Sequence, residues 1–428
     1  MAKGAEPTVS AQSRAVRLTL AASLGNLLEW YDFAVYGALA ATLGRVFFPA
    51  SAPGSALLQS FAVFAVGYLM RPVGSLVLGP VGDRIGRRRL LQVSIAVMAL
   101  ASVLIGLLPS HGQAGNGAAA MLVALRMAQG FSLGGEYTGS MTYVVELAPQ
   151  GRRAWLGSLT AVGSVLGMVA GSLSASLIQA ALPAAAVQAW GWRLPFLVAG
   201  GLALLALWLR RDLPEPPADP VASPAEAAAF RRSLRREGRR ILQVMAILAF
   251  EKISFYLVYV FWVQRAISLH PGQAAAFNGL TTLVQAAGIP VILMAGRLAD
   301  RVSPRRLMGR WLVLLALLIA PAMLLLKRAE LAPMALGMAL ATLPLMLIAG
   351  SCPALMPLLF ARRSRCTAFS VSYSIGGSLL GGTAPALAAW MLAQLGWSMG
   401  PLLYALVWAI PALLVIGRLE EPGAQAQP

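Results

Sequence analysis

The sequence is poor in charged side chains, and above all in acidic ones. Only 12% of its 428 residues are charged, whereas 58% are hydrophobic. A water-soluble domain of this composition would expose far more apolar surface than soluble proteins tolerate. This scarcity excludes an ordinary soluble protein and indicates an all-α protein embedded in a lipid bilayer.

Lysine and cysteine are also scarce. The three lysines are Lys3, Lys252 and Lys327, and none follows a glycine-rich GxxxxGK[ST] loop, so ATP hydrolysis by such a loop is excluded on this chain. No HExxH or CxxC motif is present, and Cys352 and Cys366 fall near or within predicted helices, where packing roles are expected. We therefore expect no enzymatic activity, no cofactor and no metal, and any uphill transport must use an ion gradient.

Long apolar runs predict twelve membrane-spanning helices, since about 20 apolar residues cross a bilayer. The spans are expected near residues 18 to 40, 57 to 79, 90 to 108, 118 to 147, 155 to 179, 193 to 209, 241 to 263, 274 to 296, 307 to 326, 332 to 358, 367 to 394 and 399 to 417.

The basic residues predict the orientation of these spans. The net charge is +18, and with both termini in the cytoplasm 26 of the 34 Lys and Arg residues fall in inner segments, against four in outer loops. This asymmetry is the positive-inside signal of a membrane protein. It accounts for the basic character of the chain without a nucleic-acid partner.

Two related basic segments divide the chain. GPVGDRIGRRR at residues 79 to 89 and GRLADRVSPRR at residues 296 to 306 each follow one apolar run and precede another. Such duplication is typical of carriers built from two similar membrane halves. We expect a six-helix bundle over residues 1–209, a cytoplasmic linker over 210–240 and a second six-helix bundle over 241–428.

Acidic residues within the first predicted span are candidate transport residues. Glu29 and Asp32 are three residues apart and share a helical face, which Asn26 and Tyr36 extend. Two neighbouring carboxylates cannot both ionise cheaply in a low dielectric, so one of them is expected to take up a proton. The alternative is a structural ion pair, such as Glu29 with Arg71, that only holds helices together.

Other polar residues are predicted at a similar depth in the membrane. Glu136, with Tyr137 beside it, completes a layer with Arg71 and the acids of the first span. Arg126 and Gln129 are either a buried pair that responds to the charge of a carboxylate or a clasp between helices. Side chains of the second half, including Tyr256, Tyr259, Asn278, Gln285 and Tyr373, are expected on the other side of a binding pocket.

Glu146 differs from these acids because it lies at the inner end of its span, near Arg152 and Arg153. We expect it to form a salt bridge in a cytoplasmic gate. In the seventh span Glu251 precedes Lys252, which is unusual at a membrane centre. Glu251 is either a second titrating site or is partnered locally.

Several motifs resemble those of a known superfamily. Signatures of the major facilitator superfamily are resembled in three places: GDRIGRRR with its upstream Gly79, RMAQG, and the degenerate second basic segment at residues 296 to 306. Five segments resemble the metabolite:proton symporter branch of this superfamily: GNLLEWYDFAVYG (25 to 37), FAVGYLMRPVG (64 to 74), RMAQGFSLGGEYTGS (126 to 140), WGWRLPF (190 to 196) and GGTAP (381 to 385). This branch includes carriers for 2-oxoglutarate, citrate, shikimate, and proline or glycine betaine.

This resemblance implies the major facilitator fold of two six-helix bundles, alternating access, and proton-driven uptake through a bacterial inner membrane. It also implies a place in the transport pathway for the acids of the first span and Arg71, and an inner gate formed by Asp83, Arg84, Arg87 and Arg88. Asp300 and Arg301, in the second basic segment, are the corresponding gate residues of the other half. In this segment Ser303 and Pro304 replace the usual Gly-Arg, so this part of the gate is expected to be weaker or differently paired.

The resulting hypothesis is proton symport of a small carboxylate or zwitterion, with Arg71 as the cation for a carboxylate. The alternative is proton-exchange efflux of a metabolite or drug, which is disfavoured because the fifth span reads GSVLGMVAGS and lacks the Gly-Pro pattern of antiporters. The sequence identifies neither the solute nor the oligomeric state, and a monomer is the working expectation.

Overall fold

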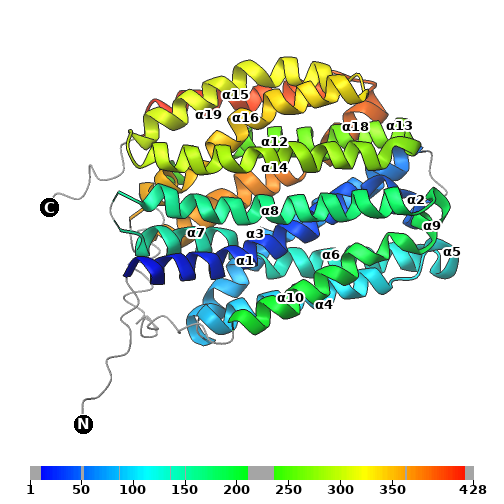
Figure 1. Ribbon diagram of the computed structural model, residues 1–428, viewed down its shortest axis with the longest axis horizontal. Coiled ribbons are helices and arrows are strands. Elements are labelled where there is room, and N and C mark those ends of the chain that lie inside the picture. The colour runs from blue at the N-terminus through cyan, green and yellow to red at the C-terminus, as the bar shows by residue number, and fades with distance from the viewer. Residues whose placement is uncertain are drawn as a thin grey trace, which may run out of the picture.

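The structure is a computed structural model that describes residues 11–49, 53–85, 87–134, 136–149, 151–210, 236–361 and 364–419. Within these ranges it contains helices and no strand. The helices run nearly side by side along the longest axis of the molecule (Figure 1). Seven described helical stretches are long and apolar enough to cross a membrane, and three further apolar helices are shorter.

The helices that precede residue 211 form the N-terminal half. They are α1 (Ala11–Ala38), α2 (Ala40–Phe47), α3 (Pro53–Ile85), α4 (Arg87–Leu107), α5 (His111–Ala114), α6 (Asn116–Ser132), α7 (Glu136–Leu147), α8 (Arg153–Ala181), α9 (Ala184–Ala186), the π-helix η1 (Val187–Gly191) and α10 (Arg193–Arg210).

The helices that follow residue 235 form the C-terminal half. They are α12 (Gly238–Tyr256), the π-helix η2 (Leu257–Phe261), α13 (Trp262–Leu269), the short η3 (Pro271–Gln273), α14 (Ala274–Ala299), α15 (Pro304–Leu326), α16 (Leu331–Leu355), the short η4 (Pro357–Leu359), α17 (Arg365–Ser372), the π-helix η5 (Tyr373–Gly381), α18 (Ala384–Leu395) and α19 (Gly400–Ile416).

Interrupted helices explain why the chain has more helices than predicted spans. The first span continues from α1 into α2, the fourth from α6 into α7, the seventh from α12 through η2 into α13, and the eleventh from α17 through η5 into α18. With these joined, the described chain forms the twelve spans predicted from the apolar runs. The all-helical major facilitator fold is confirmed.

Glycines let α3 and α6 approach closely. A Cβ atom at Gly130 would lie 1.8 Å from the backbone oxygen of Gly67, and one at Gly74 would lie 1.9 Å from that of Phe131. Since real Cβ atoms never come so near, only glycine allows this packing. The contact fixes Arg126, on α6, against the helix that carries Arg71.

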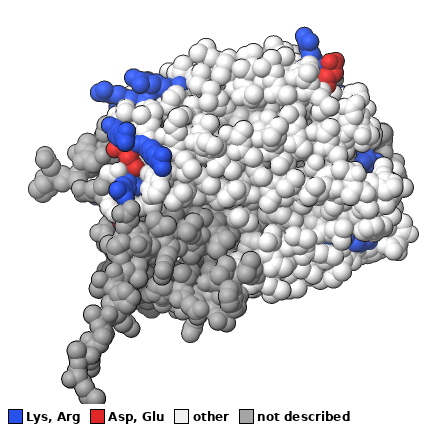
Figure 2. All heavy atoms as spheres, in the orientation of Figure 1, with Lys and Arg blue, Asp and Glu red and all other residues white. Residues whose placement is uncertain are grey.

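The surface follows the bilayer pattern. Large apolar side chains such as Leu100, Leu204 and Leu317 are more than 60% exposed. Figure 2 shows a mostly uncharged face, with Lys and Arg gathered at the end where α1 begins. This is the end expected to face the cytoplasm from the positive-inside rule. The two halves meet along α8 and α14, which lie side by side (Figure 1).

Candidate functional site

Two buried ion pairs join α1 to its neighbours in the N-terminal half. Arg71 Nη2 of α3 lies 2.5 Å from Glu29 Oε1, and Arg126 Nη1 of α6 lies 3.0 Å from Asp32 Oδ2. Glu29, Asp32 and Arg126 are fully buried, and Arg71 is 4% exposed. The shared face predicted for the two acids is present, but each acid has its own arginine.

The Asp32 pair belongs to a closed hydrogen-bond network. Ser102 of α4 donates to Asp32 Oδ1 at 2.6 Å, and Arg126 donates to Gln129 Oε1 at 2.8 Å. The Gln129 amide in turn donates to Ser102 Oγ at 2.8 Å. Arg126 therefore contacts a carboxylate, and the network connects α1, α4 and α6, as expected for a clasp between helices. A response of the pair to the charge of the carboxylate stays a prediction.

Aromatic rings separate the two pairs. The guanidinium carbons of Arg71 and Arg126 each lie 4.7 Å from the centre of the Phe33 ring. Arg126 also lies 4.4 Å from the Tyr36 ring and 5.8 Å from the Phe64 ring. Stacking of this kind stabilises a desolvated cation. Phe33 was not predicted as a site residue, although it directly follows Asp32 and lies one helical turn after Glu29 on α1, which is the signal that indicates it.

Asn26 and Tyr36 lie on α1 without contacting either carboxylate. Asn26 accepts a hydrogen bond from Ser140 of α7 at 3.1 Å, and Tyr36 donates to the backbone oxygen of Ser60 at 3.1 Å. Both side chains are fully buried. Asn26 therefore holds α1 against α7, whereas Tyr36 is one of the rings around Arg126.

The predicted tyrosines cluster where the two halves meet. Tyr256 of α12 donates to the hydroxyl of Tyr68 on α3 at 2.7 Å, and the rings of Tyr137 and Tyr373 are 4.9 Å apart. Each pair joins one residue of the N-terminal half to one of the C-terminal half. The structure thus brings Tyr137, Tyr256 and Tyr373 to the interface between the halves, and their role in binding a solute stays a prediction.

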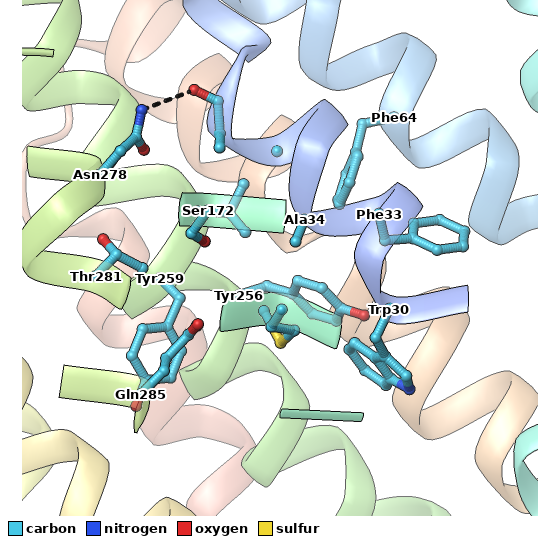
Figure 3. Close-up of a pocket in the computed structure, with 14 residues that line it drawn as sticks. Trp30, Phe33, Ala34, Phe64, Ser172, Tyr256, Tyr259, Asn278, Thr281 and Gln285 are labelled. Carbon is cyan, nitrogen blue, oxygen red and sulfur yellow. Dashed lines mark hydrogen bonds between the residues drawn. The ribbon is translucent and has the colours of Figure 1, made fainter. Parts of the chain in front are cut away.

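A small cavity of about 20 Å³ lies between the halves, well below the roughly 300–1,000 Å³ of small-molecule sites, so it must widen to admit a solute. Its walls come from α1, α3, α8, α12, η2 and α14, and Figure 3 shows Phe33, Phe64, Trp30 and Tyr256 around it. Because Phe33 and Phe64 also face Arg126, the cavity is one ring away from the Asp32 network.

Gln285 of α14 is a buried polar residue of this cavity whose side-chain amide is available to bind a ligand. It is 1% exposed, and neither its Oε1 nor its Nε2 has a hydrogen-bond partner in the described part of the chain. Asn278, two turns earlier on the same face of α14, instead has partners, because its amide donates to Gln179 Oε1 at 2.8 Å and to the backbone oxygen of Ala38 at 3.2 Å. A solute with both donor and acceptor groups would complete Gln285.

Glu251 and Lys252 are partnered locally. Lys252 Nζ lies 3.1 Å from Glu251 Oε1, and the residues are 8% and 4% exposed, respectively. The Lys252 ammonium also faces the rings of Trp30, Phe255 and Tyr373 at 5.3 to 5.9 Å. The local pair of the sequence analysis is present, whereas the three rings around the ammonium were not foreseen.

The inner end carries contacts between the halves. Glu146 of α7 pairs with Arg365 of α17 at 2.8 Å rather than with its chain neighbours Arg152 and Arg153. Asp300 accepts hydrogen bonds from the backbone N–H groups of Ala154 and Trp155, at 2.8 and 2.9 Å, in the first turn of α8. Burial raises the pKa of the Asp300 carboxyl, and these two donors oppose the rise.

The remaining gate residues are less informative. Arg301 is exposed and Arg153 is half-buried, with no hydrogen-bond partner for its Nε in the described residues. The side chains of Asp83, Arg84, Arg87, Arg88 and Glu136 lie outside what the structure describes, although their backbones are helical. Residues 211–235 of the expected linker also lie outside the described ranges.

At the opposite end the halves are joined by Gln264 of α13. Its amide donates to the backbone oxygen of Ala38 at 3.0 Å, and its Oε1 accepts from the backbone N–H of Ala41 at 3.1 Å. The cavity is therefore bracketed by contacts between the halves at both ends. No group of three His, Cys, Asp or Glu side chains among the described residues could hold a metal ion.

Residues 18–245 match the sugar (and other) transporter family. The chain belongs to this family of the major facilitator superfamily. It is 34% identical over 418 residues to the ectoine/proline transporter ProP of Corynebacterium glutamicum, covering 93% of this chain and 82% of the relative. It is 31% identical to the glycine betaine/proline/ectoine/pipecolic acid transporter OusA of Dickeya dadantii, over 95% and 83% of the two chains.

Solved structures of the superfamily share the fold. A crystal structure of a D-xylose–proton symporter superposes with a TM-score of 0.75 at 19% identity, covering 95% of this chain and 98% of the symporter. The human organic anion transporter MFSD10 superposes with a TM-score of 0.66 at 18% identity. The family and the fold establish an integral membrane transporter of small solutes, a non-enzymatic function.

Proposed function

We propose that this protein is a proton-coupled symporter that takes up a small zwitterion, of the proline, betaine or ectoine type, by alternating access. The observation that carries the proposal is the fully buried Asp32–Arg126 pair one ring away from the cavity. Buried ion pairs are poor devices for stability alone, and ionisable groups within membranes usually serve transport. The two relatives named for proline and ectoine support the solute class.

Asp32 is the proposed proton carrier. In its ionised form it holds Arg126 at 3.0 Å and accepts from Ser102. Protonation removes the negative charge and frees Arg126 to strengthen its contact with Gln129. Because the network reaches α1, α4 and α6, a change of proton occupancy acts on three helices of one half at once.

Charge balance favours a zwitterion over an anion as the solute. The described acids of the membrane interior, Glu29, Asp32 and Glu251, are each paired with a base, namely Arg71, Arg126 and Lys252. A zwitterion adds no net charge to this balanced interior, whereas an anion adds one that must be compensated. We assign the solute carboxylate to Arg71, whose planar fork can make two parallel hydrogen bonds, with Glu136 as a further proton-titrating group.

The transport cycle is proposed to rock residues 1–209 against residues 241–428. At the inner end the Glu146–Arg365 pair and the Asp300 contact with α8 close the transport path, together with the basic segment that contains Asp83. We further propose that the linker over 210–240 and both termini face the cytoplasm and that the membrane is the inner membrane of a bacterium. Breaking the inner contacts opens the cavity to the cytoplasm.

Uptake by the purified carrier in proteoliposomes tests this proposal. Radiolabelled proline, glycine betaine, ectoine and 2-oxoglutarate are each offered with an imposed inward proton gradient, and then with a protonophore. We expect accumulation of one or more of the zwitterions, lost with the protonophore. Accumulation that requires sodium and is indifferent to the proton gradient would contradict proton coupling, and accumulation of 2-oxoglutarate alone would contradict the solute class.

A further inference from the structure

Three aromatic rings surround the Lys252 ammonium. Trp30 of α1, Phe255 of α12 and Tyr373 of η5 have their ring centres 5.5, 5.3 and 5.9 Å from Lys252 Nζ. All three side chains are buried, with 4, 6 and 5% of their surface exposed. Three electron-rich faces around one cation form an aromatic cage, an arrangement that also binds ligands with cationic head groups.

The backbone beside this cage packs closely against Lys252. A Cβ atom at Gly381 would lie 2.5 Å from Lys252 Cβ, so glycine is needed there, whereas one at Gly377 would make an ordinary contact of 3.5 Å with the Tyr373 ring. Both glycines belong to the π-helix η5, which packs on α12. The site therefore depends on a local departure from regular helix, which is common at functional positions in helices.

Trp30 connects the cage with the cavity. Its side chain lines the cavity in Figure 3 and also faces the Lys252 ammonium. Phe255 packs against Tyr256 and Tyr259, two further residues of the cavity wall, with ring centres 5.3 and 4.9 Å apart. Because Trp30 belongs both to the cavity wall and to the cage, a solute in the cavity lies next to the cage.

We propose that the cage of Trp30, Phe255 and Tyr373 is the subsite for the quaternary ammonium group of a zwitterionic solute, and that Lys252 occupies it as a tethered competitor. This inference rests on the proposed solute class and deepens it. Exchange is feasible because the lysine ammonium keeps a second partner, Glu251 Oε1 at 3.1 Å, when it leaves the rings.

The chemistry of the rings favours a methylated ammonium. A quaternary ammonium has no N–H group and needs no hydrogen-bond acceptor, so ring faces alone can replace its hydration. A primary or secondary ammonium leaves N–H donors that these rings do not satisfy. The cage therefore selects glycine betaine over proline among solutes that share a carboxylate.

A pair of matched probes isolates the contribution of the positive charge. Glycine betaine and 3,3-dimethylbutanoate have the same shape and carboxylate, but a carbon replaces the quaternary nitrogen in the second. Direct binding of both to the purified full-length carrier gives an affinity ratio for each variant. In the parent we expect glycine betaine to bind more tightly, by about tenfold or more.

Substitution of one ring should change this ratio selectively. Trp30→Leu is expected to lower it about tenfold, and Trp30→Phe, which keeps a ring, to retain most of it. Phe369→Leu is the matched control, because Phe369 is fully buried and packs on Tyr373 but is not among the rings that face the ammonium. Its ratio should equal that of the parent.

Removal of the competitor is the second arm. The double variant Glu251→Gln with Lys252→Ala removes both charges of the pair and empties the cage, so glycine betaine should bind about threefold more tightly or better. Weaker binding in this variant would overturn the proposal, because Lys252 would then be a ligand of the solute. An unchanged affinity ratio in Trp30→Leu would overturn it as well. By contrast, a parent that binds neither probe nor proline would contradict the proposed function itself.

Discussion

The Asp32 carboxylate and the Arg126 guanidinium lie 3.0 Å apart, and neither side chain is exposed. Ser102 and Gln129 complete the network around them. Removing one charge from such a buried pair leaves the other uncompensated, which costs about 3–5 kcal/mol. In the proposed mechanism the pair acts as a switch whose state depends on whether the carboxylate carries a proton.

Asp32→Asn is expected to abolish proton-driven accumulation while solute exchange continues, because asparagine resembles the protonated acid permanently. Counterflow and gradient-driven uptake in proteoliposomes measure the two activities separately. Glu330→Gln makes the same chemical change at an exposed outer position and should leave both unchanged. Normal accumulation by the Asn variant would show that Asp32 is not the proton carrier.

The 2.5 Å contact between Arg71 and Glu29 gives a second prediction. Variants of this pair separate a role of Arg71 in solute recognition from a purely structural role. Arg71→Ala should lower stability by about 3–5 kcal/mol by removing the arginine partner of Glu29. Adding Glu29→Ala should restore much of the stability but not solute binding. Thermal unfolding and direct binding of the parent, both single variants and the double variant measure this. Parent-like binding by the double variant would reduce Arg71 to a helix clasp.

Glu146 and Arg365 test the inner gate. The pair is partly exposed, at 30 and 15% of the two side chains, so its contribution should be about 1 kcal/mol or less and should weaken in salt. Glu146→Gln should increase the accessibility of a cysteine placed in the cavity to a cytoplasmic reagent by less than about fivefold. The charge swap Glu146→Arg with Arg365→Glu should reverse the effect, and failure of the swap would argue against a direct pair.

Gln285 and Asn278 give opposite expectations for the same kind of substitution. Gln285→Leu should weaken solute binding about tenfold yet leave stability unchanged or about 1 kcal/mol higher, because its buried amide has no partner among the described residues. Asn278→Leu should lower stability by about 1–3 kcal/mol, since it leaves Gln179 and the Ala38 carbonyl without their donor. If the Gln285 variant binds solute as the parent does, the solute does not contact Gln285 and the proposed binding role of this residue is wrong.

Much of the fold could be predicted from the sequence because the bilayer imposes simple rules. Span length, apolar composition and the distribution of Arg and Lys are enough to predict twelve helices and their orientation. The breaks within spans were not predicted. Gly134, for example, lies in the turn two residues after the end of α6, where a Cβ atom would lie 2.2 Å from the backbone nitrogen of Ser75. This contact with another helix cannot be recognised from helical periodicity.

The candidate site was predictable in its charges but not in its pairing. Glu29, Asp32, Arg71 and Arg126 stand out because ionisable residues are rare in membrane spans. Which acid contacts which arginine depends on the packing of α3 and α6 against α1, and on Ser102, which has no distinguishing feature in the sequence. The same limit explains Glu146, whose partner Arg365 is 219 positions away rather than next to it.

Proton movement caused by solute alone is the most direct test of the central claim. When glycine betaine or proline is added outside lightly buffered proteoliposomes with no imposed gradient, symport should carry protons inward, so the external medium becomes more alkaline. The signal should disappear in Asp32→Asn. External acidification would indicate exchange of solute for protons, and solute entry without a pH change would contradict proton coupling altogether.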